Sequence, residues 1–396
     1  MADSLRLGVL ATHPIQYHAP LFRELTGRPG VELTVYFAHQ PTPVEQGAGF
    51  GVPFTWDVDL TSGYRHVFLG GGGGGEAAGP GAPATRDAEP DMEEAIRHRD
   101  FDSFLVMGWH DVSYRRAIRA CWSARVPVLV RGDSQLTTDA SAVKRAVKRV
   151  TYPYFMRRFA ACLSVGRRSE EYFRHYGARR VIRSPHFVDN AFFAARAAAF
   201  APRRAELRQS WGATDDSVVV LFAGKLQTKK RPLDLVSAVA RSARPNLRVL
   251  VVGDGELRQA TERAAAEEGV PATFTGFLNQ TEIPAAYAAA DVLALPSDAG
   301  ETWGLVVNEA MASGLPAIVS DAAGCAPDLI VPDVTGWRHP LGDVDAVASI
   351  LRRIADAPQL LRGAGNAARM HVAGYNVCSA ADGVLAAADA GLAEAA

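Results

Sequence analysis

Two glutamates with seven residues between them stand in the segment ETWGLVVNE, which has the clearest chemical pattern of the chain. The segment follows the apolar run VLALP, so a strand is predicted to end just before it and a helix to begin near Gly304. The free backbone amides of Gly304, Leu305 and Val306 would then face the carboxyl edge of a sheet, where a phosphate group binds well. Glu301 can accept hydrogen bonds from sugar hydroxyls. Glu309, whose side chain points back toward the helix N-terminus, can hold a ribose diol.

A second pattern, FAGKLQTKKRPLDLV, also follows a buried strand. Lys225 comes directly after Gly224 at the end of the strand, and Lys230 lies beside the start of the next predicted helix. Two ammonium groups at the carboxyl end of a strand can neutralise a diphosphate. The lysines alone fit a solvated turn equally well, but the glutamates at the same sheet edge favour a site for a nucleotide diphosphate.

Several segments, in this order and spacing, resemble the donor domain of the retaining glycosyltransferases of family 4: GKLQTKKRP, VVGDGE, TGFLN to YAAADVLALPS, ETWGLVVNE and AMASGLPAIVSDAAG. The resemblance covers about residues 189–340. In the first half it is one of architecture, and SPHFVDNAFF resembles the linker between the two domains of the family. The resemblance implies an α/β protein of GT-B fold, in which two Rossmann-like, doubly wound domains face each other across a cleft. It also implies transfer of a sugar from a nucleotide diphosphate, commonly UDP, to an acceptor hydroxyl with retention of configuration.

Carried over by position, the resemblance places the donor on the second domain. Lys225 and Lys230 would hold the diphosphate, Glu301 the hexose and Glu309 the ribose, and the backbone at residues 277–278 would meet the nucleobase. The expected donor-binding residues are Gly224, Lys225, Lys230, Phe277, Leu278, Glu301, Gly304, Leu305, Val306 and Glu309.

The first domain departs from the family at one position. The family commonly has a histidine after a strand near residue 130, beside the reacting carbon, whereas VPVLVRGDSQL has Asp133 there. His110 in MGWHD and His13 in ATHPIQYH also follow strands that open into the same cleft, although packing roles remain open for both. The candidates for catalysis are Asp133, His110 and Glu301, and those for the acceptor side are His13, Gln16, Tyr17 and Trp109.

Two rival cofactor motifs are weaker. VVGDGELRQ has the first two glycines of a dinucleotide fingerprint but Arg258 in place of the third, which argues against an NAD site. Asp57 and Asp59 resemble the metal-binding pair of the other major glycosyltransferase fold. Because lysines already supply positive charge at the expected diphosphate site, we expect no metal and no cofactor besides the nucleotide-sugar co-substrate.

Short β-branched runs alternate with helix-length segments along the whole chain, which predicts parallel sheets with crossover helices. We predict a first domain over residues 1–189, a second over 190–375, and a C-terminal helix over 376–396 that crosses back to the first domain. Residues 70–90, which have almost no large apolar side chains, are expected to form a mobile loop. The predicted strands are Leu5–Ala11, Val31–Phe37, Ser103–Gly108, Pro127–Arg131, Ala161–Val165, Ser217–Ala223, Leu247–Val252, Thr273–Gly276, Val292–Leu295 and Ala317–Ser320, with a last strand of the first domain in VIRS.

The charge of the chain is segregated. Its 42 basic and 43 acidic side chains nearly cancel, yet residues 101–250 hold 28 of the basic and only 11 of the acidic ones. Within this region Ser141–Phe159 places Val143, Val147, Val150 and Phe155 near one helix face, flanked by lysines and arginines. Such a helix can rest on an anionic membrane surface, and a basic surface helix of the acceptor domain is the alternative. No nucleic-acid partner is expected.

The remaining composition narrows the class of protein. With 48% hydrophobic and 21% charged residues, the chain is globular in composition, and its four scattered cysteines predict neither a disulfide framework nor a zinc site. Without a basic N-terminal region before an apolar run, we expect a cytoplasmic protein, peripheral at the inner membrane face. The acceptor is expected to be a sugar, a lipid-linked molecule or a small molecule. Two other functions stay open: a sugar-nucleotide epimerase or phosphorylase of the same fold, and a non-catalytic protein that binds a membrane or a polyanion.

Overall fold

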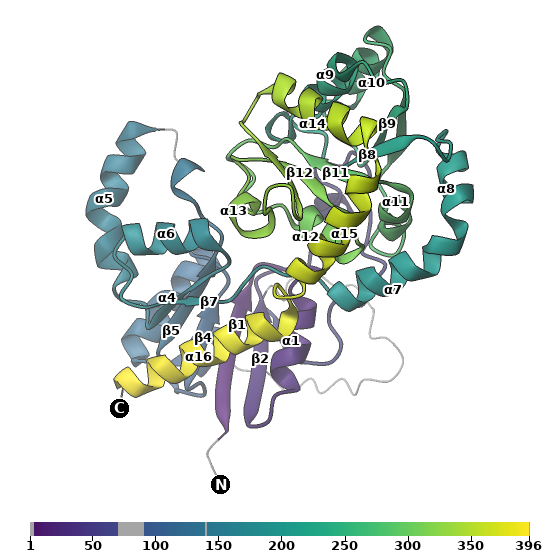
Figure 1. Cartoon of the computed structure of the whole chain (residues 1–396). Coiled ribbons are helices and arrows are strands. Elements are labelled where there is room, and N and C mark those ends of the chain that lie inside the picture. Colours follow the sequence, from purple (N-terminus) through teal and green to yellow (C-terminus); the bar gives the residue numbers. More distant parts are fainter. Residues whose placement is uncertain (1–3, 70–90, 139–140, 396) are drawn as a thin grey trace.

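The computed structural model describes residues 4–69, 91–138 and 141–395, so the loop expected at residues 70–90 lies outside the described residues. Two parallel β-sheets, each with helices on both faces, follow one another along the chain (Figure 1). Among the helices described, none combines the length and apolar character that a membrane span requires.

The first sheet has the strand order β3-β2-β1-β4-β5-β6-β7, and all of its pairings are parallel. The order reverses between β1 and β4, so the carboxyl ends of these two strands open a crevice, as in other doubly wound sheets. The strands are β1 (Leu5–Ala11), β2 (Val31–Phe37), β3 (Arg65–Phe68), β4 (Ser103–Val106), β5 (Val128–Gly132), β6 (Ala161–Ser164) and β7 (Val181–Arg183).

The helices between these strands cover both faces of the first sheet, and the C-terminal helix α16 (Val377–Ala395) lies on one of them beside α1, as Figure 1 shows in yellow. The chain thus returns to its first sheet after completing the second. The other helices of this part are α1 (Ala19–Thr26), α2 (Pro43–Gln46), α3 (Met92–Arg97), α4 (Val112–Ala124), α5 (Ala142–Met156) and α6 (Arg167–His175), with a 3₁₀ turn η1 (Leu136–Thr138).

The second sheet has six parallel strands in the order β10-β9-β8-β11-β12-β13. Its central strand β8 shows why the sheet is buried on both sides: Val219 and Leu221 pack into one core cluster, whereas Val220 and Phe222 pack into the other. The strands are β8 (Val218–Ala223), β9 (Leu247–Val252), β10 (Ala272–Gly276), β11 (Val292–Leu295), β12 (Ala317–Ser320) and β13 (Gly336–His339).

Nine helices and two 3₁₀ turns are described in the second half besides α16. Helix α7 starts directly after Asp189, and the turn η2 joins it to α8. The elements are α7 (Asn190–Phe200), η2 (Ala201–Arg203), α8 (Arg204–Ser210), η3 (Thr228–Lys230), α9 (Pro232–Ser242), α10 (Arg258–Glu267), α11 (Ile283–Ala289), α12 (Leu305–Ala312), α13 (Ala326–Leu329), α14 (Val344–Asp356) and α15 (Gln359–Val372).

The sequence pattern locates every predicted strand to within about two residues but misses β3 and β13. Both are four-residue strands at the edge of a sheet, and both contain charged or polar side chains: β3 reads RHVF and β13 reads GWRH. An edge strand is covered less completely than a central one, so it lacks the continuous apolar run by which buried strands are recognised.

Candidate functional site

A cavity of about 420 Å³ lies between the two sheets, at the carboxyl ends of β5 and β8. The second domain contributes most of its wall and the first domain closes the other side. Its lining residues are Tyr17, Phe50, Asp133, His186, Gly224, Lys225, Gln227, Lys229, Lys230, Glu301, Thr302, Trp303, Gly304, Leu305 and Val306. The structure therefore brings together residues from both predicted motifs and from the first domain.

Three lysines give the cavity its charge. Lys225 directly follows β8 and Gly224, while Lys229 and Lys230 come from the turn η3, before α9. The whole chain has only five lysines beside its many arginines, and three of the five are at this cavity. Burial, and then the positive charges of Lys229 and Lys230, lower the pKa of Lys225. An anion in the cavity would relieve this repulsion.

The N-terminus of α12 points its free amides at the same cavity. Gly304, the residue before the helix, has φ +107°, and a Cβ atom on it would lie 2.7 Å from the Leu295 side chain. Only glycine fits this position without strain, and it allows the chain to turn from the loop into the helix. The unpaired amides of the first turn and the three lysines thus converge on one space, as a diphosphate requires.

Glu301 and Lys230 form an ion pair at the wall of the cavity. Both side chains are largely buried, with 12% and 13% of their surfaces exposed. Lys230 therefore lies between the expected diphosphate position and the carboxylate expected to meet the sugar. A ligand at the diphosphate position would share Lys230 with Glu301, because the lysine already forms an ion pair with that carboxylate.

Glu309 is buried, and it does not line the cavity. Its two carboxylate oxygens accept hydrogen bonds from the hydroxyls of Tyr17, at 2.8 Å, and Tyr287, at 2.5 Å. Burial raises the pKa of Glu309 to about 7, although both hydroxyl bonds oppose this change. Tyr17 belongs to the first domain, so this carboxyl group links the two domains in the conformation described.

Asp133 follows β5 and reaches the cavity from the first domain. Its carboxylate accepts a hydrogen bond of 2.6 Å from the hydroxyl of Thr302, a neighbour of Glu301 in the second domain. Of the three candidates for catalysis, Asp133 and Glu301 thus lie in one cavity. His110 does not line it: this residue is exposed, and its ring lies next to Trp109.

The acceptor-side candidates are divided. Tyr17 lines the cavity, whereas His13, Gln16 and Trp109 do not. The Trp109 side chain is buried in the core of the first domain against Phe173, so it serves packing in this conformation. His13 lies beside His39, with ring centroids 5.3 Å apart, and burial together with that neighbour lowers its pKa.

The expected nucleobase position is covered by residues 47–57 of the first domain, which we call the cover segment. Phe277 lies outside the cavity wall, stacked on Phe54 at a centroid distance of 4.2 Å and against Phe50 at 4.9 Å. The Lys225 Nζ atom donates a hydrogen bond of 2.5 Å to the carbonyl oxygen of Ala48. Leu278 is also outside the wall.

His186 is a cavity residue that the sequence pattern did not single out. It lies in the linker after β7, its ring is 5.4 Å from that of Trp303, and burial lowers its pKa well below the usual value. Beside it Arg131 is buried and donates to the carbonyl oxygen of Pro185, and desolvation lowers its pKa to about 10. The only sequence signal for His186 was its place in the SPHFVDNAFF linker.

The rival motifs are engaged in other contacts. Asp57 accepts hydrogen bonds from Thr281 across the domain boundary, and Asp59 accepts from the backbone of the turn that follows it, at residues 61 and 62. Arg258 forms ion pairs with Asp254 and Glu262. Within the described ranges no group of three or more histidine, cysteine, aspartate or glutamate side chains could hold a metal ion.

Comparison with known proteins shows which family and relatives the chain resembles. Residues 203–371 match the model of the family described as Glycosyl transferases group 1. The chain is 35% identical over 192 residues to the sulfoquinovosyl transferase SQD2 of Arabidopsis thaliana, covering 48% of the chain and 36% of that relative. It is 38% identical over 181 residues to a GDP-mannose-dependent alpha-mannosyltransferase of Mycobacterium tuberculosis (strain CDC 1551 / Oshkosh), covering 44% of each. The chain therefore spans less than half the length of these curated relatives.

The fold is similar to that of solved GT-B proteins. The crystal structure of Anabaena Alr3699/HepE in complex with UDP matches with a TM-score of 0.70 at 17% identity, over 97% of this chain and 98% of that one. At this identity the likeness concerns the fold alone. Together with the family match, it confirms the resemblance to group 1 glycosyltransferases and the two-domain GT-B fold.

Proposed function

We propose that this chain, a GT-B protein whose residues 203–371 match the group 1 glycosyltransferases, transfers a sugar from a nucleotide diphosphate to an acceptor hydroxyl. The observation that carries the proposal is the meeting of three lysines, the α12 N-terminus and Glu301 in one cavity between the domains. A cavity of this kind offers positive charge to a diphosphate and a carboxylate to the adjoining sugar.

In the proposed reaction the bond between the anomeric carbon and the diphosphate oxygen breaks while the acceptor oxygen bonds to that carbon from the same face. Because the new bond forms on the face that the diphosphate leaves, the configuration is retained, and the acceptor proton passes to an oxygen of the departing phosphate. Lys225, Lys229 and Lys230 and the α12 amides would stabilise the charge that develops on the diphosphate. With these cations in place, we propose that no metal is required.

Asp133 and His186 are the proposed first-domain residues of the reacting face, because both line the cavity opposite Glu301. Asp133 would place a negative charge near the anomeric carbon as it becomes electron-poor. His186, which burial keeps neutral, could bond a sugar hydroxyl. His110 and His13 do not line the cavity, and the proposal gives them no role at the reacting face.

Donor entry would require the cover segment and Tyr17 to move. Phe54 is stacked on Phe277, next to the backbone that the base would meet, and Tyr17 is bonded to one of the Glu309 oxygens that the ribose would use. We therefore propose that the described conformation is a closed one and that the donor binds as these first-domain contacts open.

We propose UDP as the donor nucleotide, with GDP as the main competitor because one curated relative is named for GDP-mannose. The proposed acceptor is a sugar, a lipid-linked molecule or a small molecule. We further propose that Ser141–Phe159 brings the enzyme to an anionic membrane surface. The acceptor would then determine whether the product belongs to polysaccharide, glycolipid or natural-product synthesis.

A thermal-shift screen with UDP, GDP, ADP and their sugars tests the proposal, because a ligand of the native state raises the melting temperature. We expect one nucleotide diphosphate to raise it clearly, and an NMR spectrum of the glycoside product to show the anomeric configuration of the donor. Absence of any nucleotide effect would contradict a transferase. A free sugar or an epimer formed without acceptor would instead support the phosphorylase or epimerase alternative.

A further inference from the structure

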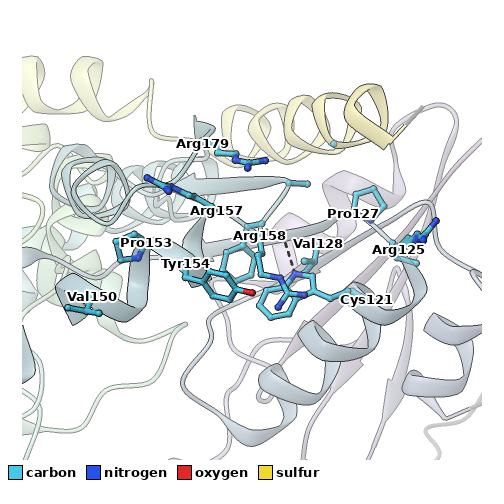
Figure 2. A pocket seen from close by; sticks show the side chains of 15 residues that line it. Cys121, Arg125, Pro127, Val128, Val150, Pro153, Tyr154, Arg157, Arg158 and Arg179 are labelled. Carbon is cyan, nitrogen blue, oxygen red and sulfur yellow. Dashed lines mark hydrogen bonds between the residues drawn. The ribbon is translucent and has the colours of Figure 1, made fainter. Parts of the chain in front are cut away.

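A second pocket, of about 780 Å³, lies on the first domain between α4, α5 and the C-terminal end of α16 (Figure 2). Its volume exceeds that of the cavity between the domains, which is about 420 Å³. Its lining residues are Cys121, Trp122, Arg125, Val126, Pro127, Val128, Val150, Pro153, Tyr154, Arg157, Arg158, Phe159, Ala160, Arg179 and Gly391.

This arginine pocket is separate from the proposed transfer site. Val128, at the start of β5, lines the pocket, whereas Asp133, just after the end of β5, lines the cavity between the domains. Five strand residues at roughly 3.3 Å each put about 16 Å of sheet between the two. A molecule in the arginine pocket thus contacts the opposite edge of the sheet from the donor.

Arginine side chains give this pocket its charge. Four arginines line it, and among the described lining residues none is acidic. Within the part of the chain that the structure describes, Arg125, Arg157 and Arg158 form no ion pair, and the Arg158 guanidinium lies over the Trp122 ring at 3.7 Å. Figure 2 draws Arg157 and Arg179 on one side of the pocket and Arg125 on the opposite side, with Arg158 between them. Guanidinium groups so placed suit phosphate oxygens, which they can bind through two parallel hydrogen bonds.

An exposed apolar stripe of α5 runs into this pocket. The side chains of Val143, Val147, Val150 and Tyr154 are 72%, 56%, 79% and 74% exposed, and the last two also line the pocket. Their spacing of four, three and four residues places them on one helix face. The sequence-based expectation included Phe155 instead, but this residue is turned about 140° from Val150 and packs against Trp122.

The stripe and the pocket together suit an amphiphilic ligand. Basic side chains of α5 flank the valines, and the apolar face they border would be covered by hydrocarbon while arginines meet an anion. A free phosphate would satisfy the arginines but leave the valines exposed to water. An anionic lipid satisfies both.

We propose that the arginine pocket binds the phosphate headgroup of an anionic phospholipid, with the α5 stripe lying in the acyl boundary of the same leaflet. This site deepens the membrane contact proposed above by naming the residues and the lipid group, and it is independent of the donor site. The enzyme would then be held on the membrane through one edge of the first sheet, while the opposite edge faces the transfer cavity.

Co-sedimentation of the full chain with vesicles tests this site. We expect binding to vesicles of equal parts phosphatidylcholine and phosphatidylglycerol, and little binding to phosphatidylcholine alone. Arg125→Gln with Arg157→Gln should weaken binding about tenfold or more. The matched control is Arg263→Gln with Arg369→Gln, two exposed arginines of the second half, which removes the same charge away from the pocket. An equal loss in both double variants would overturn the proposed pocket and leave only general electrostatic attraction.

Two further experiments distinguish binding of a lipid from binding of a soluble phosphate. Val147→Ser with Val150→Ser should weaken vesicle binding while leaving the effect of inorganic phosphate on the melting temperature unchanged. Inorganic phosphate could stabilise the parent but not the Arg125 and Arg157 double variant, while vesicles do not bind at all. That result would mean a soluble phosphate ligand and would overturn the lipid proposal. On the same variants, a nucleotide diphosphate should raise the melting temperature as much as it does for the parent. A failure of the proposed donor site can therefore be distinguished from a failure of the lipid site.

Discussion

At the scale of single residues, Glu309 shows how burial decides what a motif residue does. Its place in ETWGLVVNE predicts a contact with ribose, but the carboxyl group is enclosed by Tyr17 and Tyr287, and its pKa is raised to about 7. In the unfolded chain the same group would lose its proton near the usual glutamate value, about 4.3. Between these two pKa values, the folded state therefore keeps on Glu309 a proton that the unfolded state has released.

This difference predicts a pH-dependent stability. As pH rises from about 4.5 to about 7, the free energy of unfolding should fall, because the native state binds more protons than the unfolded one. Glu309→Gln removes the titrating group and keeps hydrogen bonding to the tyrosines. Differential scanning calorimetry between pH 5 and pH 8 should show a smaller decrease in melting temperature for this variant than for the parent. Parallel curves for the two proteins would contradict the assignment.

Asp133 permits a second test at this scale, since its charge and its hydrogen bond can be removed separately. Asp133→Asn keeps an oxygen to accept from Thr302 but loses the negative charge, and should lower the transfer rate about tenfold or more. Thr302→Val removes the hydrogen bond and keeps the charge, so its rate should fall less. Steady-state kinetics on both variants measure the difference; a larger loss in Thr302→Val would assign Asp133 a positioning role only.

At the scale of elements, the cover segment links the donor side to the first domain. Its contacts with the second domain include the Phe54 stack on Phe277 and hydrogen bonds to Asn279 and Thr281. An aromatic stack of this kind contributes about 0.5–1.5 kcal/mol beyond its buried area. A nucleotide base that displaces Phe54 must overcome that contribution.

Phe54→Ala should therefore tighten nucleotide-diphosphate binding by roughly 2- to 10-fold, because less free energy is needed to open the base position. Isothermal titration calorimetry measures the change. Trp56→Ala is the control, since Trp56 packs on Phe54 and makes no ring contact with Phe277 among the residues described. Weaker binding by Phe54→Ala would show that Phe54 itself stacks on the base.

The same elements show what the sequence could predict. Buried strands such as β8 and β9 were located because every residue of these runs is apolar or nearly so, and Gly304 marked the start of α12. Their order along the chain placed the lysines and Glu301 at one sheet edge. The cover segment has no such pattern: its place on Phe277 depends on how two separately folded sheets meet, which local propensity does not encode.

At the scale of the whole molecule, the crossing of α16 back to the first sheet and the contacts at the cavity tie the two halves together. Gln135 donates to the carbonyl oxygen of Ala299 at 2.6 Å, and Arg168 donates to that of Ala322, also at 2.6 Å. These contacts, with the Tyr17 hydrogen bond to Glu309, join the two domains in the described conformation, in which the cavity has walls from both. His186 is a candidate only because the folded linker brings it to the cavity between the two domains.

The lysines provide the most direct measurement of the proposed chemistry. Isothermal titration of the preferred nucleotide diphosphate into the parent, Lys230→Ala and Lys144→Ala compares a cavity lysine with an exposed lysine of α5. Lys230→Ala loses a charge-assisted bond to phosphate, so we expect it to bind the nucleotide at least about tenfold more weakly. Lys144→Ala should bind it as the parent does, and both variants should be folded. Equal affinity of all three proteins, or no nucleotide binding by the parent, would contradict a sugar-nucleotide transferase site in this cavity.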